Sequence, residues 1–104
     1  MTTDVRDNPA ANRYEIYVDG ALAGFAEYHL HRDLAAFTHT EVDDAHQGQG
    51  VASELIKGAL DDARARALRV EPFCRFVRAF IEKHRDEYRD LVPEPEWERF
   101  GLGG

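Results

Sequence analysis

The stretch from Thr40 to Leu60 places the tightest constraint on what this chain can fold into. It reads TEVDDAHQGQGVASELIKGAL and predicts a strand that ends at Val42, a short loop with two glycines, and then a helix. Apolar residues recur at helical spacing in the last part, at Val51, Leu55, Ile56, Ala59, Leu60 and Ala63. We therefore expect an amphipathic helix that begins directly after a glycine loop.

A strand, a glycine loop and a helix in this order direct several free backbone N–H groups toward one point. These donors and the positive end of the helix dipole favour a phosphate or pyrophosphate group. The two best-known phosphate motifs do not fit, because GxGxxG needs a glycine where Ser53 stands and a P-loop needs a Gly-Lys-Ser/Thr ending. The alternative is a glycine-containing loop that only begins a helix.

Length and charge indicate one cytoplasmic domain. The 104 residues suffice for one modest core, and no segment approaches the length of a membrane span. The net charge of −7, with no basic patch before residue 64, argues against a nucleic-acid partner. The single cysteine, Cys74, excludes an intrachain disulfide, and the first residues lack a signal-peptide pattern. His29 and His31 share a strand face without an evident third ligand, so we expect no metal.

The first half of the chain predicts an antiparallel meander. Residues 1–12 are polar and are expected to form a flexible tail. Alternating apolar residues then predict strands over 13–18, 21–30 and 34–42. Asp19-Gly20 is typical of a tight turn between the first two of these strands.

The second half predicts helices around one more strand. The helix after the glycine loop is expected to reach about residue 67, and a fourth strand over 68–71 ends where Pro72 follows. A second helix is expected over 73–83, with Phe73, Phe76 and Phe80 in its core-facing stripe, and a third helical piece over 85–91. Residues 93–104 are expected to be a partly ordered tail, with Trp97 and Phe100 as the residues that could pack back onto the domain. The whole predicts an α+β fold with one domain over 13–92.

The loop sequence Gln47-Gly48-Gln49-Gly50-Val51-Ala52 resembles the Q/R-x-x-G-x-G/A signature of the GNAT acetyltransferase superfamily. Further blocks carry a resemblance to its short, single-domain YjdJ-type branch, which has a cysteine after the last core strand. These blocks are THTEV at 38–42, GQGVAS at 48–53, PFCRFV at 72–77, and the stretch IEKH at 81–84 with Glu87-Tyr88. The resemblance extends over about residues 13–92.

This resemblance implies acetyl-coenzyme A as the cosubstrate and an amine as the acetyl acceptor. It also implies that the third and fourth strands splay apart and that the pantetheine arm enters the gap between them. The pyrophosphate would rest on the backbone amides of Gln49 to Ala52. The full set of implied binding residues is Val42, Gln47, Gly48, Gln49, Gly50, Val51, Ala52 and Ser53.

Three residues are candidates for catalysis. Cys74, at the expected start of the second helix, is either a nucleophile whose thiolate the helix dipole stabilises or a buried residue that lines the pocket. The resemblance carries a cysteine at this position and suggests the first role. His39 and Glu41 lie two apart on one strand face, where a general base is expected, or they serve only as structural partners of the loop.

The sequence also departs from larger GNAT proteins. The helices that usually follow the first strand have no room, because Asp19-Gly20 joins the first two strands directly. The acceptor site is therefore open, shallow or completed by another subunit, and no oligomeric state is predicted. Two alternatives to an N-acetyltransferase stay open: a module that binds coenzyme A or another phosphorylated ligand without catalysis, and a small interaction protein.

Overall fold

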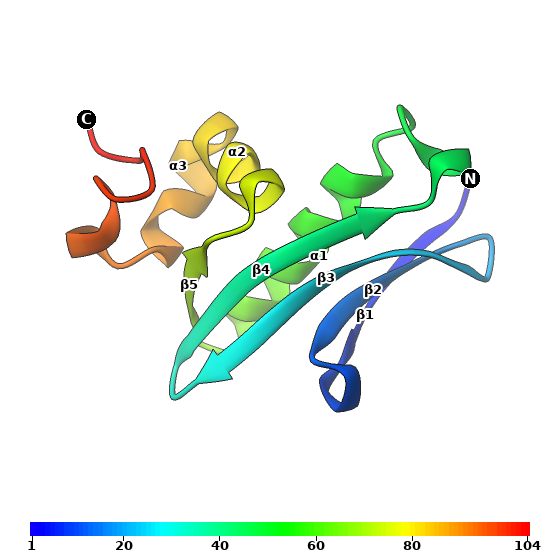
Figure 1. Cartoon of the computed structure of the whole chain (residues 1–104), viewed down its shortest axis with the longest axis horizontal. Coiled ribbons are helices and arrows are strands. Elements are labelled where there is room, and N and C mark those ends of the chain that lie inside the picture. The colour runs from blue at the N-terminus through cyan, green and yellow to red at the C-terminus, as the bar shows by residue number, and fades with distance from the viewer.

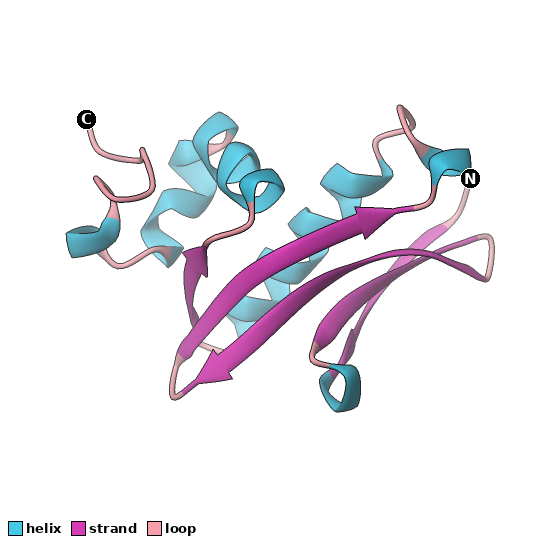
Figure 2. Cartoon of the chain, in the orientation of Figure 1, coloured by secondary structure: helices cyan, strands magenta, loops and turns pink.

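The computed structural model describes all 104 residues and is built on one five-stranded sheet (Figures 1 and 2). The strands lie side by side in chain order: β1 (Thr3–Asn8), β2 (Arg13–Val18), β3 (Ala21–His31), β4 (Leu34–Val42) and β5 (Arg69–Pro72). Neighbouring strands are antiparallel except β4 and β5, which are parallel. This arrangement confirms the predicted α+β fold and the meander of β2, β3 and β4.

Helix α1 (Val51–Ala65) lies behind the sheet in Figure 1 and packs against all five strands. Its six predicted apolar residues are the six that the structure buries, which confirms the helical spacing. They meet alternate residues of the strands, among them Tyr14, Ile16 and Phe37, in one core. The opposite face of the sheet carries no helix over β2 and β3, in agreement with the direct turn at Asp19-Gly20.

The expectation of a flexible tail over residues 1–12 is wrong, because Thr3–Asn8 forms strand β1 and Pro9–Ala11 a short 3-10 helix. β1 pairs with β2 along its full length, from Thr3 opposite Val18 to Asn8 opposite Arg13. The sequence TDVRDN contains only one apolar residue, Val5, so it shows no apolar alternation. Charged residues of this kind are common on an edge strand, where they discourage pairing with other chains.

A polar network ties β1 to the far end of α1. The Tyr28 hydroxyl donates to Asp7 at 2.7 Å, and Arg66 donates to the other oxygen of Asp7 at 2.8 Å. The Tyr14 hydroxyl donates to Asp62 at 2.7 Å. Burial, and then the hydrogen bond to Asp7, raises the pKa of Tyr28 to about 12. The N-terminal strand is therefore held by polar contacts as well as by its ladder with β2.

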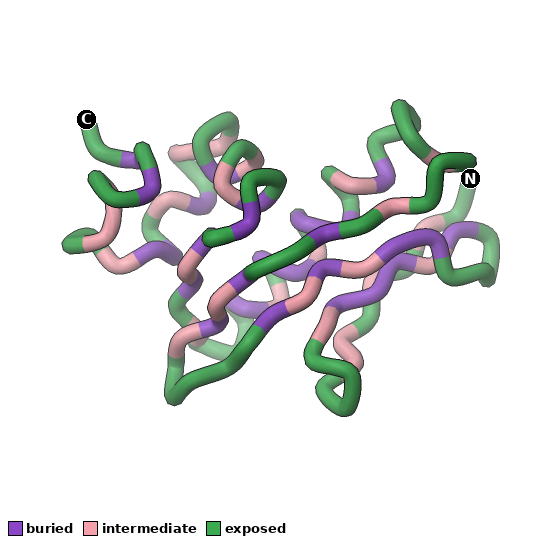
Figure 3. The backbone as a smooth tube through the Cα atoms, in the orientation of Figure 1, coloured by how far each residue is buried: buried purple, intermediate pink, exposed green.

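The C-terminal segment also differs from the expected tail. Phe100 and Leu102 are buried in the core, and Figure 3 shows buried positions, in purple, close to the C-terminus. The Trp97 indole N–H donates to the Val92 carbonyl at 2.8 Å, and the Leu102 N–H donates to the Trp97 carbonyl at 2.7 Å. The domain therefore extends beyond residue 92. Its last apolar residues are buried one by one and form no periodic pattern that would predict a helix or strand.

Helix α2 (Arg75–Lys83) begins two residues later than expected and buries only Val77 and Ile81. The predicted core positions of Phe73 and Phe76 are wrong, since 42% and 56% of these residues remain exposed. Helix α3 (Arg85–Tyr88) and a 3-10 turn over Arg89–Leu91 follow, which agrees with the predicted third helical piece. None of the helices combines the length and the apolar character that crossing a membrane requires.

Strands β4 and β5 are paired only over their first four residues, after which β5 turns away from β4 and leads into α2 (Figure 1). The last pair joins Phe37 and Pro72. Beyond it, the register of β4 against β3 shifts next to Thr38, and β5 leaves the sheet to enter α2. The rest of β4, up to Val42, therefore has no strand on that side.

The close contact between Gly58 of α1 and Val5 of β1 predicts how the N-terminal strand contributes to stability. A Cβ atom on Gly58 would lie 2.8 Å from Val5 Cβ. In an exposed helix, glycine to alanine is favourable by about 1 kcal/mol, whereas overpacking costs about 1–3 kcal/mol. We expect Gly58→Ala to lower the free energy of unfolding, as measured by urea titration.

The Val5→Ala variant provides the matched control. Because it removes Cγ1 and Cγ2, two of the three Val5 atoms that the new methyl group meets, and leaves Cβ in place, we expect Gly58→Ala to be less harmful in a Val5→Ala background than in the wild type. A single Gly58→Ala variant that gains stability in the wild-type background would show that β1 does not pack against α1.

Candidate functional site

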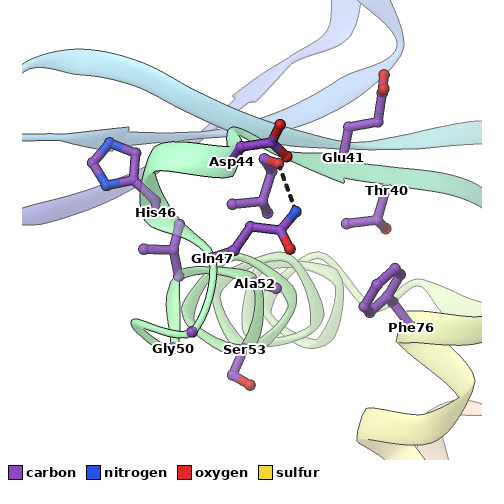
Figure 4. A pocket seen from close by; sticks show the side chains of 12 residues that line it. Thr40, Glu41, Asp44, His46, Gln47, Gly50, Ala52, Ser53 and Phe76 are labelled. Atoms are coloured by element: carbon purple, nitrogen blue, oxygen red, sulfur yellow. Dashed lines mark hydrogen bonds between the residues drawn. The ribbon is translucent and has the colours of Figure 1, made fainter.

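A cavity of about 390 Å³ lies where the end of β4, the glycine loop, the first turn of α1 and helix α2 meet (Figure 4). Most of the residues predicted from the loop motif line it. The lining residues are Thr40, Glu41, Val42, Asp44, His46, Gln47, Gly48, Gly50, Val51, Ala52, Ser53 and Phe76. Gln49, which was also predicted, does not line the cavity.

The start of α1 offers a set of free backbone donors to this cavity. Gly50 precedes the helix with φ of +76°, a conformation that glycine adopts without strain, and no side chain caps the helix. The N–H groups of Gly50, Val51, Ala52 and Ser53 have no acceptor in the protein. The expected donor set shifts by one residue, because the Gln49 N–H donates to the His46 carbonyl at 3.3 Å.

The side chains of two glutamines stabilise the conformation of the glycine loop. Gln47 Nε2 donates to the Val42 carbonyl at 3.4 Å, the dashed contact in Figure 4, and so ties the loop to the end of β4. Gln49 Oε1 lies 3.2 Å from His46 Nδ1. These contacts fix the loop in the conformation that leaves the next amides free.

The charge of the cavity comes from the backbone. No lysine or arginine lines it, and the acidic side chains of Glu41 and Asp44 stand on the β4 side. The free amides and the positive end of the α1 dipole, equivalent to about half an elementary charge, are the features that attract an anion. An anionic group is therefore directed to the helix end of the cavity, away from the two carboxylates.

The unpaired part of β4 adds further backbone groups. The Asp43 N–H donates to the Ala23 carbonyl at 2.8 Å, so the amide of Asp43 faces β3. Successive residues of an antiparallel strand direct these groups to opposite sides. The backbone groups of Thr40 and Val42 therefore face the gap, where β5 supplies no partner.

Cys74 lies beside this gap and immediately precedes α2, one position before the helix in which it was expected. Its N–H donates to the Phe37 carbonyl at 2.8 Å, which anchors the residue to β4 at the last paired position. Its Sγ lies 3.3 Å from Thr40 Oγ1, and only 7% of the residue is exposed. Cys74 does not itself line the cavity, but its sulfur contacts Thr40, which does.

The position of Cys74 at the start of α2 also places it near free donors. The N–H groups of Arg75, Phe76 and Val77 have no acceptor in the protein, and no side chain caps this helix. Glu71 precedes Cys74 on β5, and its burial, followed by the neighbouring Glu96 carboxyl, raises the pKa of Glu71 above its usual range.

His39 and Glu41 share a strand face, as predicted, and His39 Nε2 lies 3.4 Å from Glu41 Oε2. Both side chains are more than half exposed. They lie on the face opposite Thr40 and Cys74, where the His39 ring meets the edge of Phe25 at a centroid distance of 6.1 Å. The structure therefore does not bring His39 together with Cys74.

Glu41 borders two cavities. The second one, of about 380 Å³, lies on the other side of the end of β4 and is lined by Arg13, Leu22, Gly24, Phe25, Glu41, Val42, Asp43 and Asp44. It shares Glu41, Val42 and Asp44 with the first cavity. The end of β4 thus stands between the two cavities, and of the three carboxylates at the second one only Asp43 is absent from the first.

Sequence reasoning missed Thr40, Asp44 and Phe76 as lining residues. Thr40 and Asp44 flank the predicted loop, so their proximity to it was a usable signal. Phe76 carried no such signal, because an aromatic residue at helical spacing is typical of a core position. No group of three or more histidine, cysteine, aspartate or glutamate residues is placed to hold a metal ion.

Known proteins share this architecture and this sequence pattern. A segment of 46 residues is 39% identical to protein NATD1 from Bos taurus and 35% identical to protein NATD1 from Homo sapiens. It covers 44% of this chain and 41% of each relative, so the match spans about two fifths of the length of those proteins.

Solved structures extend the likeness to most of the fold. A GCN5-like protein from Staphylococcus aureus matches with a TM-score of 0.65 and 25% identity over 86% of this chain and 87% of that one. The ribosomal-protein-S18-alanine N-acetyltransferase from Escherichia coli matches in fold, with a TM-score of 0.53 and 24% identity over 56% of this chain and 38% of that one. Residues 13–91 match the family described as GCN5-related N-acetyltransferase, and because this match spans more than half of the chain, the protein belongs to that family.

Proposed function

We propose that this protein is an acetyl-CoA-dependent N-acetyltransferase that passes the acetyl group to an amine by way of Cys74. The observation that carries this proposal is the row of free amides at the start of α1, which opens on a cavity that reaches the unpaired edge of β4. One end of that cavity suits a pyrophosphate, and the other end lies beside a thiol. Membership of the GCN5-related family supports acetyl-CoA as the ligand.

The coenzyme would be held mainly by backbone groups. Its pyrophosphate would accept hydrogen bonds from the amides of Gly50 to Ser53, because these donors have no other acceptor. Its pantetheine arm carries amide groups of its own, and the backbone of Thr40 and Val42 faces the gap through which it would run. The arm would thus take the place that β5 leaves vacant beside β4.

The chemical step on Cys74 is a thiol–thioester exchange. The Cys74 sulfur attacks the acetyl carbonyl carbon, a new C–S bond forms, and the bond to the coenzyme sulfur breaks. The cysteine proton ends on the departing coenzyme thiol, so the exchange needs no other reactant. A neutral amine then attacks the acetyl group on Cys74, which restores the thiol and releases the amide product.

The acceptor amine would approach from the second cavity. Its carboxylates, from Glu41, Asp43 and Asp44, attract an ammonium group. Glu41 borders both cavities and is placed to accept the proton that the amine must lose, with His39 as its neighbour at 3.4 Å. His39 does not line the first cavity, so we assign the proton-accepting role to Glu41 first.

We also propose that, within the GCN5-related family, this protein belongs to the short YjdJ-type branch. This placement is supported by Cys74, which follows the end of β5 at Pro72 with only Phe73 between them, and by the absence of helices between β2 and β3. Two other mechanisms compete with it: direct attack of the amine on acetyl-CoA with Cys74 only beside the pocket, and coenzyme binding without transfer. The two experiments below separate these three possibilities.

The first experiment measures thermal unfolding with and without acetyl-CoA. A ligand at about a hundred times its dissociation constant stabilises a protein by about 2.7 kcal/mol, and each kcal/mol moves the midpoint of a small domain by about 4–8 °C. We expect a clear rise of the midpoint for the wild type and none for Gly50→Glu, because a carboxylate at the start of α1 repels the pyrophosphate.

Gly50→Ala is the control for this variant. It imposes the same strain at a φ of +76° without adding charge, and no atom lies within 4 Å of its added Cβ. Both variants should therefore lose similar stability without ligand, while Gly50→Ala keeps most of the acetyl-CoA shift. Equal shifts in all three proteins would place the coenzyme elsewhere, and no shift at millimolar ligand would remove the proposed function.

The second experiment looks for the acetyl group on Cys74. We expect intact-mass analysis after brief exposure to acetyl-CoA without an amine to find one acetyl group, mapped by peptide analysis to Cys74 and lost in Cys74→Ala. Because the nucleophile is missing, turnover of Cys74→Ala with an amine should fall by about a hundredfold or more. A Cys74→Ala protein with full turnover would leave direct transfer, and a wild type that binds acetyl-CoA but never consumes it would leave a binding module.

A further inference from the structure

Thr40 occupies an unusual place on β4. Thr40 and Glu15 are the two polar or charged residues that the structure buries, and only 6% of the surface of Thr40 is exposed. The register shift next to Thr38 turns the following residues over, so Thr40 faces the side of the sheet that Phe37 faced before the shift. Its hydroxyl has one side-chain partner, the sulfur of Cys74 at 3.3 Å.

We propose that Thr40 is the positioning residue of Cys74, holding its sulfur at the wall of the cavity and donating a hydrogen bond to it when the sulfur carries negative charge. This inference rests on the proposed function, because it assigns a task to Cys74. It goes beyond that function in naming a second residue of β4 on which the reactivity of the thiol depends.

The surroundings of the pair support this assignment. Cys74 has its N–H committed to the Phe37 carbonyl, so its own backbone does not serve the sulfur. Thr40 lines the cavity and its hydroxyl contacts the Cys74 sulfur, so this contact connects the sulfur to the wall of the space that a thioester would enter. Figure 4 shows the Thr40 side chain directed toward the α2 side of the cavity, where Phe76 stands.

The exchange step shows why a hydroxyl at this point matters. As the Cys74 sulfur attacks the acetyl carbon, its proton departs and the sulfur passes through a state with negative charge before the new C–S bond is complete. A hydroxyl donates to such a sulfur, whereas a methyl group in the same place leaves it without a side-chain donor. Hydrogen bonds to charged groups are typically worth a factor of about ten or more in an equilibrium constant.

Two variants separate the hydroxyl from the packing of the residue. Thr40→Val keeps the branched shape and removes the hydroxyl, while Thr40→Ser keeps the hydroxyl and removes the methyl group. Because Cys74 is the only cysteine of the chain, the rate at which iodoacetamide adds to a cysteine reports this sulfur alone. Thermal unfolding of the same proteins reports packing, and acetylation of Cys74 by acetyl-CoA reports the exchange.

We expect Thr40→Val to slow both alkylation and acetylation of Cys74 about tenfold, and Thr40→Ser to stay within about threefold of the wild type. The order of stability should be the reverse, since Thr40→Ser loses a buried methyl group and Thr40→Val does not. If Thr40→Val is the more stable but less reactive variant and Thr40→Ser the less stable but more reactive one, the hydroxyl and not the packing of residue 40 determines the reactivity of Cys74.

Other results overturn the inference. If Thr40→Val reacts as fast as the wild type, or if both variants lose reactivity in step with stability, Thr40 only packs against Cys74. Alkylation needs no coenzyme, so it tests Thr40 even if the proposed function fails. If alkylation follows the expected order but no acetyl group ever appears on wild-type Cys74, the positioning of the sulfur stands and acyl transfer through it is refuted.

Discussion

The parting of β4 from β5 after Phe37 is the constraint on which the rest of the site depends. Two local features enforce it: the register shift next to Thr38 on one strand and Pro72, which lacks an N–H, at the end of the other. The separation leaves backbone groups of β4 without partners, and unpaired groups of this kind favour an extended ligand. It also sends the chain into α2 at the point where Cys74 can bond to Phe37.

A second constraint is electrostatic. The chain carries a net charge of −7, yet the cavity beside the glycine loop is suited to an anion. The protein resolves this conflict with backbone dipoles, because the amides of Gly50 to Ser53 are fixed donors that need no cationic side chain. Glu41 and Asp44 border both cavities at the end of β4, whereas Asp43 lines only the second one.

The sequence predicted the parts of the fold that repeat with a regular period. The six apolar positions of α1 and the three strands of the meander follow from spacing alone, and the glycine loop lies where its motif indicated. Edge strand β1 and the burial of Leu102 were missed because Val5 and Leu102 pack against or enter the core as single residues, whereas the aromatic Phe100 was expected as a residue that could pack back. Their contacts are set by tertiary packing, which leaves no local pattern.

The same reasoning explains what was predictable at the site. The loop motif located the free amides to within one residue, but the hydrogen bond of the Gln49 N–H to His46 depends on a 3-10 turn that the motif does not specify. The contact of Thr40 with Cys74 joins residues 34 positions apart and depends on the register shift in β4. The exposure of Phe76 likewise depends on how α2 is oriented against β4 and α1. Helical spacing in the sequence does not determine this orientation.

We propose that free backbone amides at the start of α1 bind the pyrophosphate of coenzyme A. Titration of ¹⁵N-labelled protein with coenzyme A, followed by its amide signals, tests this directly. We expect the largest shifts at Gly50, Val51, Ala52 and Ser53, with Gly20 and Gly101, remote from the loop in sequence, as internal references. Shifts that are absent at millimolar coenzyme A, or that centre on residues away from the start of α1, would contradict it.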